Sequence, residues 1–158
     1  MNSLYLILSL LVLLSCGNEN TATNETPIME ENNLAKITSV EFSGQPNNYT
    51  FSVTIESPDT GCDQYADWWE VFTADNTLIY RRILGHSHVN EQPFTRSGGI
   101  VDIGPDEFIY VRAHMNNTGY GTQVFSGTIN EGLKLDSLET SHANELASQS
   151  PLPQDCAF

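Results

Sequence analysis

Short segments rich in β-branched and aromatic residues recur along this sequence, with turn-forming residues between them. The clearest segment, residues 49–56, reads YTFSVTIE and alternates apolar with polar side chains. This period of two is what a half-buried strand requires. Seven segments have this character, namely residues 35–43, 49–56, 67–73, 77–84, 100–103, 108–115 and 123–129. Their number and spacing predict an all-β fold, an antiparallel sandwich of two sheets.

Residues 110–121, with the sequence YVRAHMNNTGYG, resemble the F strand and FG turn of fibronectin type III and related immunoglobulin-like domains. The resemblance implies an Ig-like sandwich in which the strands at 67–73 and 108–115 are neighbours in one sheet. It implies no particular function, because such sandwiches have many roles. We expect the sandwich to span residues 34–135 and an irregular C-terminal tail to follow at residues 136–158.

An apolar run at the N-terminus predicts export. Residues 4–14 are almost wholly apolar; they are too few to cross a bilayer but suit the hydrophobic region of a signal peptide. The run leads into Leu-Leu-Ser-Cys-Gly at residues 13–17, which resembles the lipobox of bacterial lipoprotein precursors. That resemblance implies a signal peptide at residues 1–15, acyl chains on Cys16 and a membrane anchor. Asn18, by analogy with lipoprotein sorting, favours the outer membrane of the cell envelope, on its periplasmic or its outer surface.

The segment that follows the lipobox has little to bury. Residues 16–33 are rich in Asn, Glu and Thr and contain no aromatic residue. This composition predicts a disordered tether between the lipid anchor and the folded domain. Further along the chain, a helical pattern is present at most over residues 137–148.

The charge balance excludes one class of partner. The 158 residues include 6 Lys and Arg against 20 Asp and Glu, for a formal net charge of −14. Nucleic acids attract basic surfaces, so this acidic chain is not expected to bind them. A hydrophobic content of 39% suits a modest core and excludes a protein that spans the membrane several times.

The cysteines outside the lipobox allow three interpretations. If Cys16 carries lipid, Cys62 and Cys156 remain. Outside the cytoplasm such a pair often forms a disulfide, which here would join the C-terminal tail to the loop before the third strand. Cys62 could instead be a metal ligand beside the histidines, or a buried free thiol.

Strand parity predicts a binding surface. In the strand at 108–115, alternate apolar residues should face the core, so the polar and aromatic alternates face outward. In the strand at 67–73, Trp69 is the better core residue, which leaves Trp68 outside. We expect the segment at 93–99 to cover part of this face and to bring Arg96 close. The predicted binding residues are Trp68, Glu70, Tyr110, Arg112, His114 and Arg96.

An exposed aromatic face with a charged pair suits a non-catalytic binding module for a protein or small-molecule ligand. This is the leading interpretation of function, and it needs no cofactor. The alternative is a sheet face covered by a loop or by the C-terminal tail, in which Glu70 and Arg112 form a cross-strand pair.

A second function is a metal site. In an extended chain His86 and His88 point to the same side, so both imidazoles could bind one Zn or Cu ion. His114 is a candidate third ligand, and Cys62 or Glu91 a candidate fourth. Such a metal could support a metal-dependent enzyme. The alternative is a loop whose histidines bond to backbone and neighbours. The acidic residues Asp59, Asp63 and Asp67 match no calcium loop and are expected to be solvated.

Overall fold

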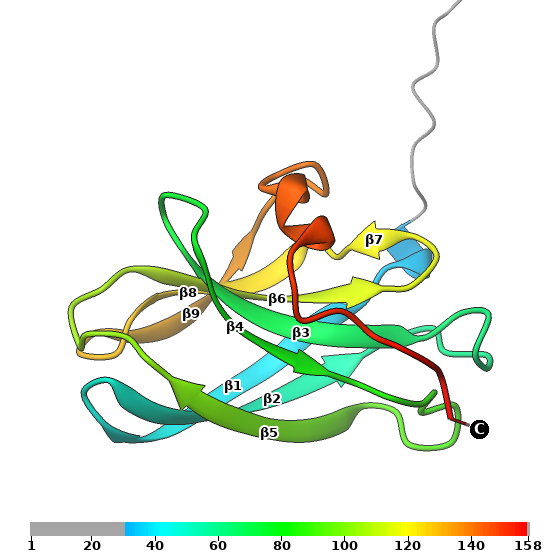
Figure 1. Cartoon of the computed structure of the whole chain (residues 1–158), viewed down its shortest axis with the longest axis horizontal. Helices are drawn as coiled ribbons and strands as arrows, with labels where there is room; N and C mark the ends of the chain where they lie inside the picture. The colour runs from blue at the N-terminus through cyan, green and yellow to red at the C-terminus, as the bar shows by residue number, and fades with distance from the viewer. Residues whose placement is uncertain (1–30, 158) are drawn as a thin grey trace, which may run out of the picture.

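The computed structural model describes residues 31–157. The predicted signal peptide, Cys16 and most of the predicted tether lie outside the described residues. The described part is all-β, with two antiparallel sheets, as the strand pattern predicted (Figure 1). Its only helical turns are the 3-10 segments η1 (Glu31–Asn33) and η2 (Asn144–Ser148) within residues 31–157. No helix in this range has the length and apolar character needed to cross a membrane.

The smaller sheet has three strands in the order β1-β2-β5. Their bounds are β1 (Lys36–Gln45), β2 (Asn48–Glu56) and β5 (Phe94–Val101). The turn between β1 and β2 contains Pro46 and Asn47, and Asn47 has a φ of 64°. Proline fixes the first turn position and asparagine tolerates the left-handed conformation, so the sequence itself favours this hairpin.

The larger sheet has the strand order β4-β3-β6-β8-β9, and the two-residue strand β7 also pairs with β6. Their bounds are β3 (Ala66–Thr73), β4 (Leu78–Ile83), β6 (Ile109–Met115), β7 (Gly119–Tyr120), β8 (Gln123–Thr128) and β9 (Gly132–Ser137). The predicted neighbours β3 and β6 pair antiparallel, with Trp68 opposite His114 and Glu70 opposite Arg112.

The core lies between the two sheets and is made of alternate residues from each. Its members include Phe51, Val53 and Ile55 of β2, Trp69 and Val71 of β3, and Ile109, Val111, Ala113 and Met115 of β6. The parity predicted for β3 and β6 is therefore correct. The likeness to fibronectin type III domains stays a prediction.

Two parts of the fold differ from expectation. Residues 93–99, predicted to cover the large sheet, instead form most of β5 in the small sheet. Phe94 is buried in the core, and the Thr54 and Thr95 hydroxyls are 2.8 Å apart across the β2–β5 pair. Alternation is weak there because Arg96 and Gly98, which pair with the core residues Val53 and Phe51, take the core-facing positions after Phe94. The predicted helix at 137–148 was also wrong, because β9 extends to Ser137 and only η2 is helical.

The C-terminal segment, residues 138–157, crosses the outer face of the large sheet over β3 and β4 (Figure 1). Its end is joined to the loop before β3 by the Cys62–Cys156 disulfide, across a sequence separation of 94. This confirms the predicted disulfide and contradicts the alternatives in which Cys62 is a metal ligand or a free thiol. The large sheet is thus covered on both sides: the core packs against its inner face, and the C-terminal segment lies on its outer face.

Candidate functional site

The outer face of the large sheet contains five of the six residues predicted to bind a partner, namely Trp68, Glu70, Tyr110, Arg112 and His114, but it is covered; Tyr110 and His114 are half-buried and the other three are buried. Arg96 lies on β5 of the small sheet and is not brought to this face. Trp68 is 3% exposed, Arg112 is 1% exposed, and Glu70 and Phe72 are 0% exposed. The prediction of an open aromatic face is therefore wrong. The parity argument placed these side chains on the correct side of the sheet, but the C-terminal segment covers them. The alternative of a face covered by the tail describes the structure.

Glu70 is at the centre of this covered face and binds two arginines. Arg112 Nε donates to Glu70 Oε1 at 2.8 Å, and Arg81 donates to Oε2 from Nε at 2.8 Å and from Nη2 at 2.5 Å. All three side chains are at most 1% exposed. A buried carboxylate held by two guanidinium groups is an ionic network in which each member needs the others. Sequence reasoning missed Arg81, although it lies opposite Glu70 on β4.

The remaining arginine donors bind main-chain carbonyls of the C-terminal segment. Arg81 donates to the carbonyl of Leu146 at 2.7 Å, and its contacts to Gln149 and Pro151 are 2.5 and 3.1 Å. Arg112 donates to the carbonyl of His142 at 2.5 Å and to that of Ala143 at 3.0 Å. The two arginines thus connect the sheet to the segment that covers it.

Aromatic rings complete the covered face. The Arg112 guanidinium lies 3.3 Å from the ring centre of Tyr120 and 4.4 Å from that of Phe72, which are cation–π contacts. Burial, followed by the nearby Glu70 charge, raises the pKa of Tyr120 well above its ordinary value, so its hydroxyl stays neutral. Phe72 also packs against Leu146 in a second apolar cluster. The face therefore stabilises the fold and offers little open surface to a partner.

His114 belongs to this face and not to a metal centre. Its ring stacks on Trp68 with the ring centres 3.7 Å apart, and its Nδ1 lies 2.7 Å from Asp67 Oδ1. Burial raises the pKa of Asp67, and the contact with His114 opposes that rise only in part. Asp67 is therefore a buried partner of His114, and its predicted solvation was wrong.

The predicted metal ligands are not brought together as one set. Cys62 is in the disulfide, and His114 is held by Asp67. Glu91 accepts two hydrogen bonds from Arg96, at 3.1 and 2.7 Å. Between residues 31 and 157, no three side chains among His, Cys, Asp and Glu are placed to share an ion. His86 and His88 do meet, with ring centres 4.4 Å apart.

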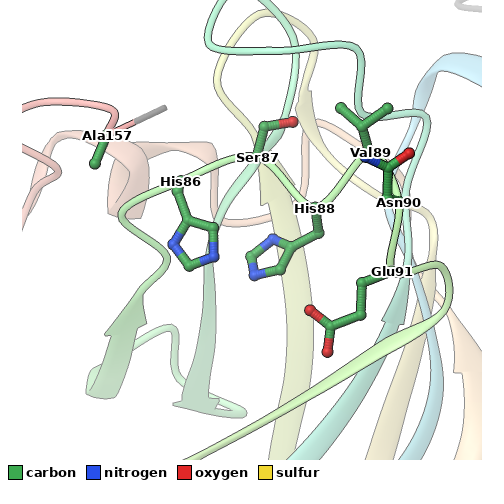
Figure 2. A pocket seen from close by; sticks show the side chains of 7 residues that line it. All are labelled: His86, Ser87, His88, Val89, Asn90, Glu91 and Ala157. Atoms are coloured by element: carbon green, nitrogen blue, oxygen red, sulfur yellow. The ribbon is translucent and has the colours of Figure 1, made fainter.

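These two histidines lie in a pocket of about 450 Å³, which we call the histidine pocket. It is lined by His86, Ser87, His88, Val89, Asn90, Glu91 and Ala157 (Figure 2). Asp59 joins the histidine loop to strand β3. Its Oδ2 accepts a hydrogen bond from the main-chain N–H of His88 at 2.8 Å, and its Oδ1 accepts one from the main-chain N–H of Ala66 at 3.0 Å. Asp59 is buried, so the expectation that it is solvated was wrong.

Ala157, at the end of the C-terminal segment described above, forms one wall of the histidine pocket. Ala157 donates its main-chain N–H to the carbonyl of Gly85 at 2.7 Å and forms a parallel bridge with His86. Cys156, the preceding residue, is fixed to Cys62 by the disulfide. The disulfide therefore holds the wall of the pocket in place.

His88 is the unusual member of the histidine pocket. It is 3% exposed and its ring stacks on Phe94 with the centres 3.7 Å apart. Within residues 31–157, neither of its ring nitrogens has a hydrogen-bond partner; the nearest acidic oxygen, Asp59 Oδ2, is 3.8 Å from Nδ1. Burial lowers the pKa of His88, and the Arg96 and His86 charges lower it further. The lowered pKa favours the neutral ring, in which one nitrogen carries a hydrogen and the other a lone pair, and neither is bonded in the described part of the chain.

Comparison with known proteins finds a relative in Halomicrobium mukohataei that bears the name "Putative lipoprotein". The two chains are 37% identical over 111 residues, which is 68% of this chain and 54% of the relative. The chain thus spans about half the length of that relative. No family model and no solved structure matches the chain.

Proposed function

We propose that this chain is a lipoprotein of the cell envelope, anchored by acyl chains on Cys16, whose β-sandwich acts as a binding module outside the membrane. The sequence Leu-Leu-Ser-Cys at residues 13–16 supports the anchor, and the lipoprotein name of the relative agrees with it. More than one acyl chain gives stable attachment, where a single chain would be marginal.

The observation that carries the proposal is the Cys62–Cys156 disulfide. Disulfides form and persist in oxidising compartments and are rare where thiols are kept reduced. A disulfide in the folded domain therefore agrees with a lipid anchor at the other end of the same chain, since both require export.

The binding site of the module is the histidine pocket. The outer face of the large sheet is occupied by the C-terminal segment through Arg81 and Arg112. The histidine pocket remains open, and it combines the apolar side chain of Val89 with polar groups of His86 and Glu91. Concave sites with a few polar groups in an apolar setting are typical of small-ligand binding.

The anchor is tested by membrane fractionation of the full chain and of its Cys16→Ser variant. The unchanged chain is expected in the membrane fraction and the variant in the soluble fraction. Ser15→Ala is the matched control, because it changes the neighbouring residue and keeps the acylated thiol. Continued membrane attachment of Cys16→Ser, or loss of attachment in Ser15→Ala alone, would contradict the proposal.

The Asn18 residue after the lipobox favours the outer membrane. In a cell that has two membranes, separation of the membranes by density should place the unchanged chain with the outer one. Asn18→Asp is expected to move it to the inner membrane. An unchanged distribution of this variant would contradict the assignment.

A further inference from the structure

The histidine pocket contains buried nitrogen atoms whose bonding capacity is unused. His88 has two ring nitrogens, both without a hydrogen-bond partner in the described part of the chain. Buried polar atoms are nearly always bonded, and an exception calls for a bound ion or water, or a functional role. Because the unbonded state costs free energy, the loop must be held in place by other contacts, and Asp59 provides them.

The second imidazole of the pocket is close enough to share a ligand with the first. His86 and His88 are two residues apart, and their ring centres are 4.4 Å apart with the planes tilted by 37°. Figure 2 shows the two rings side by side in the pocket. His86 is exposed, so its ring can rotate, whereas the ring of His88 is fixed against Phe94. One fixed and one adjustable imidazole can adapt to one ion.

We propose that His86 and His88 bind one transition-metal ion, Zn²⁺ or Cu²⁺, in the histidine pocket. This rests on the proposed binding role of the pocket and names the chemical class of its ligand. Neutral imidazole is a common ligand for both ions, and nitrogen–zinc bonds are about 2.0–2.1 Å long. Two protein ligands leave the other positions for water, so the site would be open to exchange.

Glu91 is not counted among the ligands of this two-histidine site. Its carboxylate lines the same pocket but is held by Arg96 through two hydrogen bonds. Arg96 thus offsets the Glu91 charge, and the ion would be bound mainly by nitrogen. A site of this kind favours Zn²⁺ and Cu²⁺ over Ca²⁺ and Mg²⁺, which prefer oxygen ligands.

The test is equilibrium dialysis of the full chain, purified without a histidine tag, against ZnSO₄ and separately against CuSO₄. The unchanged chain is expected to bind about one ion. His86→Ala should weaken binding by at least about tenfold, because one of two ligands is lost. His88→Phe should do the same while keeping a ring against Phe94, so that the fold is preserved. His142→Ala is the matched control, since His142 lies in the C-terminal segment beside Phe72.

Electron paramagnetic resonance of the Cu²⁺ form gives an independent readout, with two nitrogen ligands expected. No saturable binding by the unchanged chain would overturn the proposal, as would binding that survives His86→Ala, or binding lost equally in His142→Ala. Membrane fractionation of the same variants separates the two proposals. If His86→Ala stays attached to the membrane while the unchanged chain binds no ion, the metal site fails and the lipid anchor stands.

Discussion

The Glu70 carboxylate lies 2.8 Å from Arg112 Nε across the β3–β6 pair, and both side chains are almost wholly buried. Arg81 binds the other oxygen of the same carboxylate. This arrangement leaves one negative charge between two positive ones, with main-chain carbonyls taking the remaining donors. The single carboxylate offsets one of the two guanidinium charges, and the carbonyl groups satisfy the remaining donors, so each arginine depends on Glu70 and on the C-terminal segment.

Glu70→Gln is expected to lower the free energy of unfolding by about 3–5 kcal/mol, because it leaves two buried guanidinium groups without their carboxylate. Urea denaturation followed by tryptophan fluorescence measures the change. Glu131→Gln, at an exposed position after β8, is the control and should have little effect. Equal stability of the two variants would contradict the network.

Leu146→Ala tests whether the C-terminal segment is part of the folded structure. Leu146 is fully buried against Phe72, so the truncation is expected to lower the free energy of unfolding by about 2–5 kcal/mol. Leu152, which is 43% exposed in the same segment, gives the control Leu152→Ala with almost no loss. Thermal denaturation by circular dichroism distinguishes the two. A loss of less than about 0.5 kcal/mol in Leu146→Ala would show a segment that is not docked.

The double variant Cys62→Ser with Cys156→Ser should lower the free energy of unfolding by about 2–4 kcal/mol, because the unfolded chain is no longer constrained by a cross-link over 94 residues. Since Ala157 follows the disulfide and bonds to Gly85, hydrogen exchange at the Ala157 amide should also become faster. Unchanged exchange there would mean that the pocket wall is held without the disulfide.

The pH dependence of stability should include a contribution from Asp67. Burial raises the pKa of Asp67 above its ordinary value of 3.8, so the folded chain holds this proton more tightly than the unfolded chain does. Stability contributed by this group is therefore present below pH 3.8 and is lost as the pH rises through the folded-state pKa. Asp67→Asn should remove this contribution from the plot of the free energy of unfolding against pH. NMR titration of the Asp67 carboxyl checks the direction, and a pKa below 3.8 would contradict it.

The strands could be predicted where burial on one face imposes alternation. Residues 49–56 and 108–115 fall almost exactly on β2 and β6, and the core parity of Trp69 and Val111 is correct. Alternation depends only on which side of a sheet is apolar, which is local information. Strand β9 was missed because its residues are mostly exposed at the sheet edge, so little selects for a pattern there.

The sequence predicted a sheet face that is either open or covered by the C-terminal tail, and it could not decide between the two. The arginines bind main-chain carbonyl groups of the C-terminal segment. Every residue has such a carbonyl, so no residue type in the sequence indicates this contact. The cysteines gave one indication that the tail covers the sheet. A disulfide between Cys62 and Cys156 would bring the tail back to the loop before β3, but the sequence also allowed Cys62 to be a metal ligand or a free thiol. The proximity of His86 and His88 was correctly expected from their spacing, whereas His114 lies with Asp67 instead.

Arg81 and Arg112 recognise groups that all amino acids carry, so most side chains between residues 142 and 151 are free to vary. Leu146 and Ala143 are restricted there by packing in the second apolar cluster, and His142 is restricted by its ring contacts with Phe72 and Tyr110. Among homologous chains, the amino-acid sequence of this stretch should therefore vary more than that of the strands it covers. Homologous chains should keep both guanidinium groups and their shared carboxylate under tails of dissimilar composition.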